Sequence, residues 1–354
     1  MSTLFGSLSC VGVYFLALVL FQTQEAALWT VGLTLANQLL YVQSRIGMLD
    51  TFMYAFLIWA LVAFCATWLP AQKRWKSSTL FRWTGALLGY TIACKWFGVV
   101  AWGACVILFV GIRLIQQTHF QSKSPTEQSW QPKHLWRDIS WLEFGLSFGL
   151  IPAVCYFSTF IPYLFLQDGL THSPLDWWDM QFRMFDGQLR VITHHPYMSD
   201  WTGWPLMLRP IWYAFEAELG DPNYVRGVLL LGNPIIMWIG LLALIPCLVD
   251  GIRRQSRQGF LIVFFYSAFY FCWSLIPRKI SFYYYYYPAG MMLSFALAYV
   301  FFQWKPFRAQ KLQIGKWIFL GTACILFLYF FPVLAGFKIP ANSFRQWMWF
   351  QSWI

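Results

Sequence analysis

Charged residues are scarce in this sequence. Only 11% of its 354 residues are charged, whereas 59% are hydrophobic and 21% are aromatic. Soluble domains carry about 25% charged residues. The apolar stretches are continuous, long enough to span a bilayer, and recur from one end of the chain to the other. The shortage of charge therefore excludes an ordinary soluble domain and predicts an all-α, polytopic helical membrane protein.

Paired cysteines are also lacking. None of the eight Cys forms a Cys-x-x-Cys pair and most lie inside apolar runs, so we expect neither a disulfide framework nor a zinc site. The formal net charge is +11, but Lys and Arg cluster in a few short loops, which is typical of charges that set membrane topology. We therefore expect membrane lipids among the partners, and no nucleic acid.

The apolar stretches predict about ten membrane spans within a single domain, residues 1–354. No soluble domain is appended, and no internal repeat is evident. The fourth and fifth stretches are short and form either two spans or one broken passage. The predicted spans are 4–21, 27–43, 49–69, 81–94, 97–115, 141–166, 228–250, 259–277, 283–303 and 316–337.

Four loops rich in Lys and Arg are assigned to the cytoplasm by the positive-inside rule. They are 70–82, 113–140, 251–258 and 304–316. The outer side then receives the turn 44–48, the neighbourhood of Lys95, the long loop 167–227 and both termini. Most of the acidic residues fall on this side. The pattern predicts a multi-pass membrane protein whose chemistry faces outward, on the periplasmic or lumenal side.

Asp50 and Lys95 are isolated charges at the predicted outer ends of spans. An acid at a membrane boundary is either solvated there or part of a site, and Arg45 nearby either extends to the headgroups or takes part as well. Lys95 is costly in an apolar stretch unless it reaches water or pairs with an anion, which suits a lipid phosphate or a phosphosugar. The alternative is a lysine that only ends a span.

The outer loop 167–227 is rich in aromatic residues. Residues 174–190 can form an amphipathic helix with Trp178, Phe182 and Phe185 on one side, as suits a helix lying in the interface. Its Trp and Tyr residues form either an aromatic belt or a surface that stacks on sugar rings. His194 and His195 are adjacent, but no second cluster with ligand spacing supports a metal site, so we expect no cofactor and consider a divalent metal unfavoured.

A basic pair, Arg278 and Lys279, precedes five consecutive tyrosines, Tyr283 to Tyr287. Five tyrosines in a row point all round a helix, so some must face the protein interior. The tyrosines form either an aromatic girdle or, together with the basic pair, a phosphate-binding site.

These landmarks resemble the protein O-mannosyltransferase family, a branch of the C-type membrane glycosyltransferases, in its bacterial form. The resemblance covers nearly the whole chain, and the segment from His195 to Glu216 with the following Gly-Asn-Pro is its most specific part. The matching stretches are "LFGSLSCVGVYFLALVLF", "VQSRIGMLDTFM", "CKWFG", "THHPYMSDWTGWPLMLRPIWYAFE", "LGNPIIMWIGLLAL", "PRKISFYYYYYPA" and "RQWMWFQSWI".

The resemblance implies transfer of mannose from polyprenyl-phosphate-mannose to Ser or Thr hydroxyls of secreted proteins, by one inverting displacement. Such a step needs a base for the hydroxyl proton and positive charge for the departing phosphate. It implies Asp50 as a catalytic acid of the second outer loop, and Lys95, Arg278 and Lys279 as donor-phosphate ligands. The substrate-binding candidates are Arg45, His194, His195, Tyr197, Trp204 and Arg209.

One departure from the family pattern concerns the base. In the family, an outer loop after the first span carries an Asp-Glu pair that supplies it. This sequence contains no adjacent Asp-Glu pair, and its first residues align inside the second span. We therefore expect a member without its N-terminal span and first outer loop, with little or no transfer by these 354 residues alone, because a missing base costs about 10²–10⁴-fold.

Three other functions remain open from the residues. One is a related transferase that uses another lipid-linked sugar or a lipid acceptor. A second is a transporter or flippase, which predicts polar residues near the bilayer midplane and paired broken helices rather than charges at one rim. The third is a non-catalytic membrane partner subunit.

Overall fold

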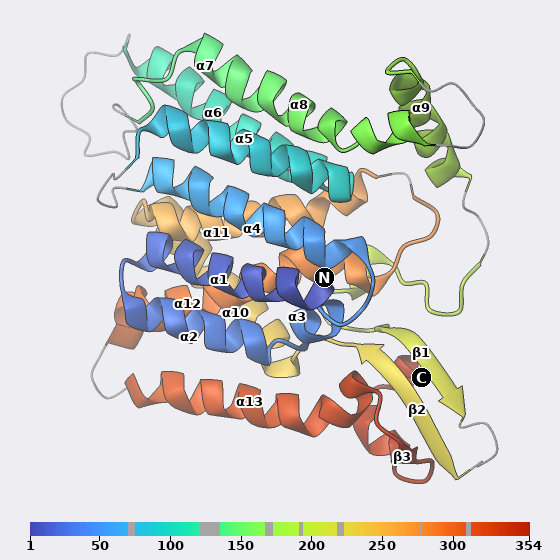
Figure 1. The fold of residues 1–354 in the computed structure, drawn as a ribbon. Helices are drawn as coiled ribbons and strands as arrows, with labels where there is room; N and C mark the ends of the chain where they lie inside the picture. The colour runs from blue at the N-terminus through green and yellow to red at the C-terminus, as the bar shows by residue number, and fades with distance from the viewer. Residues whose placement is uncertain are drawn as a thin grey trace.

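The computed structural model describes residues 1–69, 75–120, 135–166, 173–190, 194–217, 223–276, 278–308 and 313–354. Within these ranges, ten helical passages run back and forth between the two ends of one bundle (Figure 1). They are α1 (Ser2–Phe21), α2 (Gln24–Ala36) continued by α3 (Gln38–Gln43), α4 (Leu49–Trp68), α5 (Ser77–Cys94), α6 (Gly98–Phe120), α7 (Trp141–Gly145) continued through a π-helical turn (Leu146–Leu150) into α8 (Ile151–Ser158), α10 (Pro234–Arg253), α11 (Arg257–Phe271), α12 (Tyr287–Phe302) and α13 (Gln313–Ala335).

Six of the described helical segments are long and apolar enough to cross a membrane. They are Ser2–Phe21, Leu49–Trp68, Gly98–Gln117, Trp141–Phe165, Pro234–Arg253 and Gln313–Ala335. The other predicted spans are also helices in the same bundle, but they are shorter, interrupted or less apolar. The predicted fourth and fifth spans are two separate helices, α5 and α6, joined at Lys95. The chain is a multi-pass helical membrane protein, as its composition predicted.

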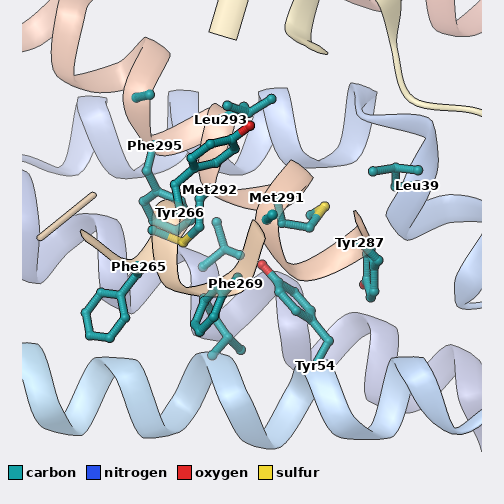
Figure 2. Close-up of a cluster of buried hydrophobic side chains, with 14 of the residues drawn as sticks. Leu39, Tyr54, Phe265, Tyr266, Phe269, Tyr287, Met291, Met292, Leu293 and Phe295 are labelled. Carbon is teal, nitrogen blue, oxygen red and sulfur yellow. The ribbon is translucent and has the colours of Figure 1, made fainter. Parts of the chain in front are cut away.

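Helix α12 forms the centre of the bundle. Every residue from Tyr287 to Val300 is buried, and the helix packs against α10, α11 and α2. A helix that is apolar on all sides is stable only when surrounded by other elements or by lipid. Figure 2 shows this core, in which the rings of Tyr54 on α4 and Tyr287 on α12 approach to 4.8 Å between centroids.

Two glycines let α5 approach its neighbour closely. Gly85 and Gly89 are one helical turn apart and face the π-helical turn and α8. A Cβ at Gly85 would collide with the carbonyl oxygen of Ser147, and one at Gly89 would lie 2.5 Å from that of Pro152. Small residues four apart allow such close helix packing within membranes.

The Gly-Asn-Pro motif connects three helices. Helix α2 ends at Ala36 and α3 begins after Asn37, so the second passage is interrupted. The side-chain amide of Asn233, just before α10, donates to the carbonyls of Ala36 (3.0 Å) and Ala323 on α13 (2.8 Å). Pro234 then occupies the first turn of α10, where its missing N–H costs nothing.

One end of the bundle carries helix α9 (Asp176–Leu189), both chain termini and a small sheet (Figure 1). The sheet order is β1 (Ile211–Ala217), β2 (Tyr224–Leu230), β3 (Ile339–Pro340), and both pairings are antiparallel. The amphipathic helix predicted over 174–190 is thus present as α9. We call this end the α9 end.

The sheet was not predicted, so the all-α prediction holds for the bundle but misses these strands. The predicted span 228–250 is correspondingly too long at its start, because Tyr224–Leu230 is a strand and α10 begins at Pro234. Parts of the predicted loops lie outside the described residues, namely 70–74, 121–134, 167–172, 191–193, 218–222, Pro277 and 309–312.

Candidate functional site

An ion pair between two helices forms the centre of the candidate site. Asp50 lies in the first turn of α4, where the helix dipole favours a carboxylate, and it is almost fully buried. Lys95 follows the last residue of α5, and its side chain is 24% exposed. The Nζ atom of Lys95 donates to Oδ1 of Asp50 at 2.7 Å. The lysine therefore has an anionic partner and a path to solvent.

Aromatic rings enclose this pair on one side. Lys95 Nζ lies 4.8 Å from the ring centroids of both Tyr284 and Tyr285, and Arg278 Cζ lies 4.9 Å from that of Tyr285. Cations at these distances are attracted to ring faces. Burial lowers the pKa of Lys95, the Asp50 carboxylate opposes that effect, and the charge of Arg278 adds to it. Two cations and one buried carboxylate leave the cluster with a net positive charge that suits a phosphate.

Tyr213 and Gln43 adjoin the cluster and were not among the predicted site residues. The Tyr213 hydroxyl on β1 donates to Oε1 of Gln43 at 3.0 Å, and its ring stacks on that of Tyr284. The Gln43 backbone carbonyl accepts from the Thr51 hydroxyl at 2.6 Å, which fixes it beside Asp50. Burial raises the pKa of Tyr213, so its hydroxyl stays protonated. The one signal for Tyr213 in the sequence is the alternation of a β-strand in "IWYAFEA", which places Tyr213 and Trp212 on opposite faces.

The outer loop is tied to the chain just before the tyrosines. Ser199 N donates to Ser281 O at 2.9 Å, and the Ser281 hydroxyl donates back to Ser199 O at 2.7 Å. Trp204 is buried, donates to the Ser199 hydroxyl at 2.9 Å and packs against the ring of Tyr285. Trp204 therefore supports the ring on which Lys95 and Arg278 rest.

The remaining predicted residues occupy different surroundings. His195 packs against Phe282 and Tyr197, and Tyr197 N donates to Nδ1 of His195 at 3.2 Å. His194 and Lys279 are exposed. The part that these four residues play in binding stays a prediction.

Two predicted arginines are engaged away from the Asp50–Lys95 pair. Arg209 donates to the carbonyls of Pro196 (2.6 Å) and Ser352 (3.4 Å), which joins the loop to the C-terminal segment. Arg45 donates to the Tyr41 hydroxyl at 2.6 Å and lies over its ring. These contacts explain what each arginine holds in place, and their substrate-binding role stays a prediction.

No group of three or more His, Cys, Asp or Glu side chains able to hold a metal ion occurs among the described residues. The chemistry of the cluster is that of cations, one carboxylate and phenols. Such a set binds and orients an anion, and it stabilises negative charge that develops on a departing phosphate.

Two family models together cover almost the whole chain. Residues 175–353 match the C-terminal four-TMM region of protein-O-mannosyltransferase, and residues 1–164 match the dolichyl-phosphate-mannose-protein mannosyltransferase model. The chain belongs to the protein O-mannosyltransferase family. The resemblance seen in the sequence is thereby confirmed.

Individual members of the mannosyltransferase family are distant relatives. The chain is 24% identical to the polyprenol-phosphate-mannose–protein mannosyltransferase of Mycolicibacterium smegmatis, over 91% of this chain and 70% of that protein. It is 23% identical to the protein of the same name from Mycobacterium tuberculosis, over 88% of this chain and 68% of that protein.

The fold is likewise that of a solved mannosyltransferase. The S. cerevisiae protein O-mannosyltransferase Pmt1-Pmt2 complex bound to the sugar donor matches with a TM-score of 0.77 at 13% identity. The match covers all of this chain and 80% of that one. At this identity the likeness concerns the fold.

Proposed function

We propose that this protein transfers mannose from a polyprenyl-phosphate-mannose donor to Ser or Thr hydroxyls of secreted proteins. Family membership supports the reaction class, and the names of the mycobacterial relatives support the donor. The single observation that carries the proposal is the cluster at the α9 end, in which Lys95 pairs with Asp50 and lies with Arg278 over the Tyr285 ring.

The reaction forms a bond between the acceptor oxygen and the sugar C1 while the bond from C1 to the phosphate oxygen breaks. The leaving group is a polyprenyl phosphate, and the hydroxyl proton passes to a base. Lys95 and Arg278 stabilise the charge that accumulates on the departing phosphate. Fixed donors in a site with little water are effective because they need no reorganisation during the step.

Asp50 has a different part in this scheme. Its Oδ1 already accepts a short bond from Lys95, and its side chain is buried. We infer that it is a positioning residue, which keeps the Lys95 ammonium in place for the phosphate. The proton acceptor is then another group, in keeping with the family's use of an Asp-Glu pair that this sequence does not contain.

The proposed place of the reaction is the outer, periplasmic face of a bacterial cell membrane. Helix α9 and the sheet lie at one end of the bundle, while the turn 254–256 between α10 and α11 and the segment Lys305–Arg308 after α12 lie at the other (Figure 1). The cluster belongs to the α9 end, because Asp50 lies in the first turn of α4 and Lys95 follows α5. The positive-inside rule assigns the opposite end to the cytoplasm.

Mannose transfer from labelled polyprenyl-phosphate-mannose to a Ser/Thr peptide, measured with the purified chain in lipid nanodiscs, tests this function. Because no Asp-Glu pair is present among these residues, the assay should resolve rates about 10²–10⁴-fold below those of a site with a general base. We expect slow transfer that the double variant Asp50→Asn/Lys95→Met abolishes and the exposed control Lys305→Ala preserves. Equal rates in all three proteins, or no transfer and no donor binding by the wild type, would refute the proposal.

A further inference from the structure

We propose that an apolar cavity between α8 and α9 binds the polyprenyl chain of the donor whose phosphate Lys95 holds. This inference rests on the proposed function, and it assigns a surface outside the charged cluster. The cavity has a volume of about 490 Å³. It is lined by Phe157, Pro174, Leu175, Trp177 and Trp178.

The cavity walls are broad and apolar. The rings of Phe157 and Trp177 are nearly parallel, 14° apart with centroids at 6.2 Å, and the ring of Trp178 lies 5.8 Å from that of Phe157 between centroids. An isoprenoid chain comes from the apolar bilayer, so it gains van der Waals contacts on such a surface, and it has no polar group that would be left unpaired there. A peptide backbone would need polar partners that this lining scarcely offers.

Hydrogen bonds hold the two walls together and connect them to the Lys95 turn. The Tyr156 hydroxyl on α8 donates to Oε1 of Gln181 on α9, and it accepts from Nε1 of Trp96 at 3.1 Å. Trp96 directly follows Lys95 in the chain. The cavity is therefore anchored to the residue proposed to hold the donor phosphate.

A ring contact also joins that turn to α9. The ring of Trp96 stacks on that of Phe185 of α9, 23° apart with centroids at 6.5 Å. Phe185 and Trp178 are seven residues apart on α9, which is about two helical turns or roughly 10 Å. In the protein, the charged cluster lies at one end and the apolar cavity beyond it. A polyprenyl phosphate likewise has its charge at one end and its apolar chain beyond. The first isoprene units therefore fit the cavity when the phosphate is at Lys95.

Chain-length dependence of the kinetics tests the proposal. We would compare a short donor, methyl-phosphate-mannose, which carries no isoprene unit, with a long polyprenyl-phosphate-mannose, using the variants Phe157→Ala and Trp177→Ala. The matched control is Trp83→Ala, an exposed aromatic residue of α5 that does not line the cavity. We expect each cavity variant to raise KM for the long donor by roughly tenfold, the loss of a modest apolar contact, with little change for the short donor.

An equal rise for both donors, or the same rise in Trp83→Ala, would overturn the assignment and indicate a general effect on packing or on contact with the bilayer. Failure of the wild type to use either donor would instead refute the proposed function. The two proposals therefore fail in distinguishable ways.

Photolabelling of the wild type gives a second test that does not depend on variants folding. The probe is a polyprenyl phosphate with a diazirine on its second isoprene unit, and labelled peptides are mapped by mass spectrometry. We expect labelling of the peptides that contain Phe157 or Trp177, suppressed by unlabelled polyprenyl phosphate and not by a bilayer phospholipid. Labelling confined to other helices, or equal suppression by phospholipid, would overturn the proposal.

Discussion

The Nζ atom of Lys95 lies 2.7 Å from Oδ1 of Asp50, although the two residues are 45 positions apart and belong to different helices. Each residue is the isolated charge of its own apolar stretch. Their pairing joins the start of α4 to the end of α5, the two helices that pack most extensively against each other. The ion pair is therefore part of the structure as well as of the candidate site.

The first prediction concerns this pair. Lys95→Met leaves a buried carboxylate without its partner, and breaking a buried pair in this way costs about 3–5 kcal/mol. The double variant Asp50→Asn/Lys95→Met removes both charges and should recover most of that loss. Thermal unfolding in detergent measures the effect. If the double variant were as unstable as Lys95→Met, the loss of stability would come from the missing lysine side chain and not from the unpaired Asp50 carboxylate.

The pH dependence of donor binding follows from the environment of Lys95. Burial lowers its pKa, so the ammonium loses its proton at a lower pH than an ordinary lysine does. A phosphate is attracted to the charged form, so KM for the donor should rise as the pH increases through this lowered pKa. Lys95→Arg keeps its charge and should shift the rise to higher pH. Identical profiles for the two proteins across neutral and alkaline pH would show that Lys95 is not the titrating group.

Close packing of α5 gives a prediction about stability alone. Gly85→Ala introduces a Cβ that collides with the Ser147 carbonyl, and such overpacking costs about 1–3 kcal/mol. Gly103→Ala on α6 is the matched control, since a Cβ there meets nothing within 4 Å. The control should be neutral or slightly stabilising, because alanine favours a helix over glycine. Equal unfolding temperatures for the two variants would contradict the close approach.

The Asn233 junction should be sensitive to a small change. Asn233→Ala removes both side-chain hydrogen bonds, and leaving buried polar groups without partners costs about 1–3 kcal/mol. The exposed Asn342→Ala is the control, for which we expect no change. Unfolding midpoints of the two variants in the same detergent decide the matter. Coincident midpoints would mean that the motif acts through Gly232 or Pro234 instead.

The sequence predicted which end of the bundle carries the isolated charges, because loop charges determine membrane orientation. It could not predict which charges meet, since that depends on helix packing. Arg45 is an example of a charge that the sequence placed at the site but that packs elsewhere. Its guanidinium donates to the hydroxyl of Tyr41, four residues earlier in the chain. The sequence predicts one span over 228–250, although its first residues belong to strand β2. Periodicity alone does not distinguish a buried strand from the start of a helix.

The Asn233 junction also constrains the order in which the protein assembles in the membrane. Chains emerge from the ribosome N-terminus first, so α2 is synthesised long before the residues that meet its end. Asn233 follows its partner Ala36 by 197 residues, and its other partner, Ala323, comes a further 90 residues later in the chain. The bond to Ala36 can form once α10 has been inserted, whereas the bond to Ala323 forms only after insertion of α13. Insertion of α13 is thus the step that completes the hydrogen bonding of the Asn233 junction.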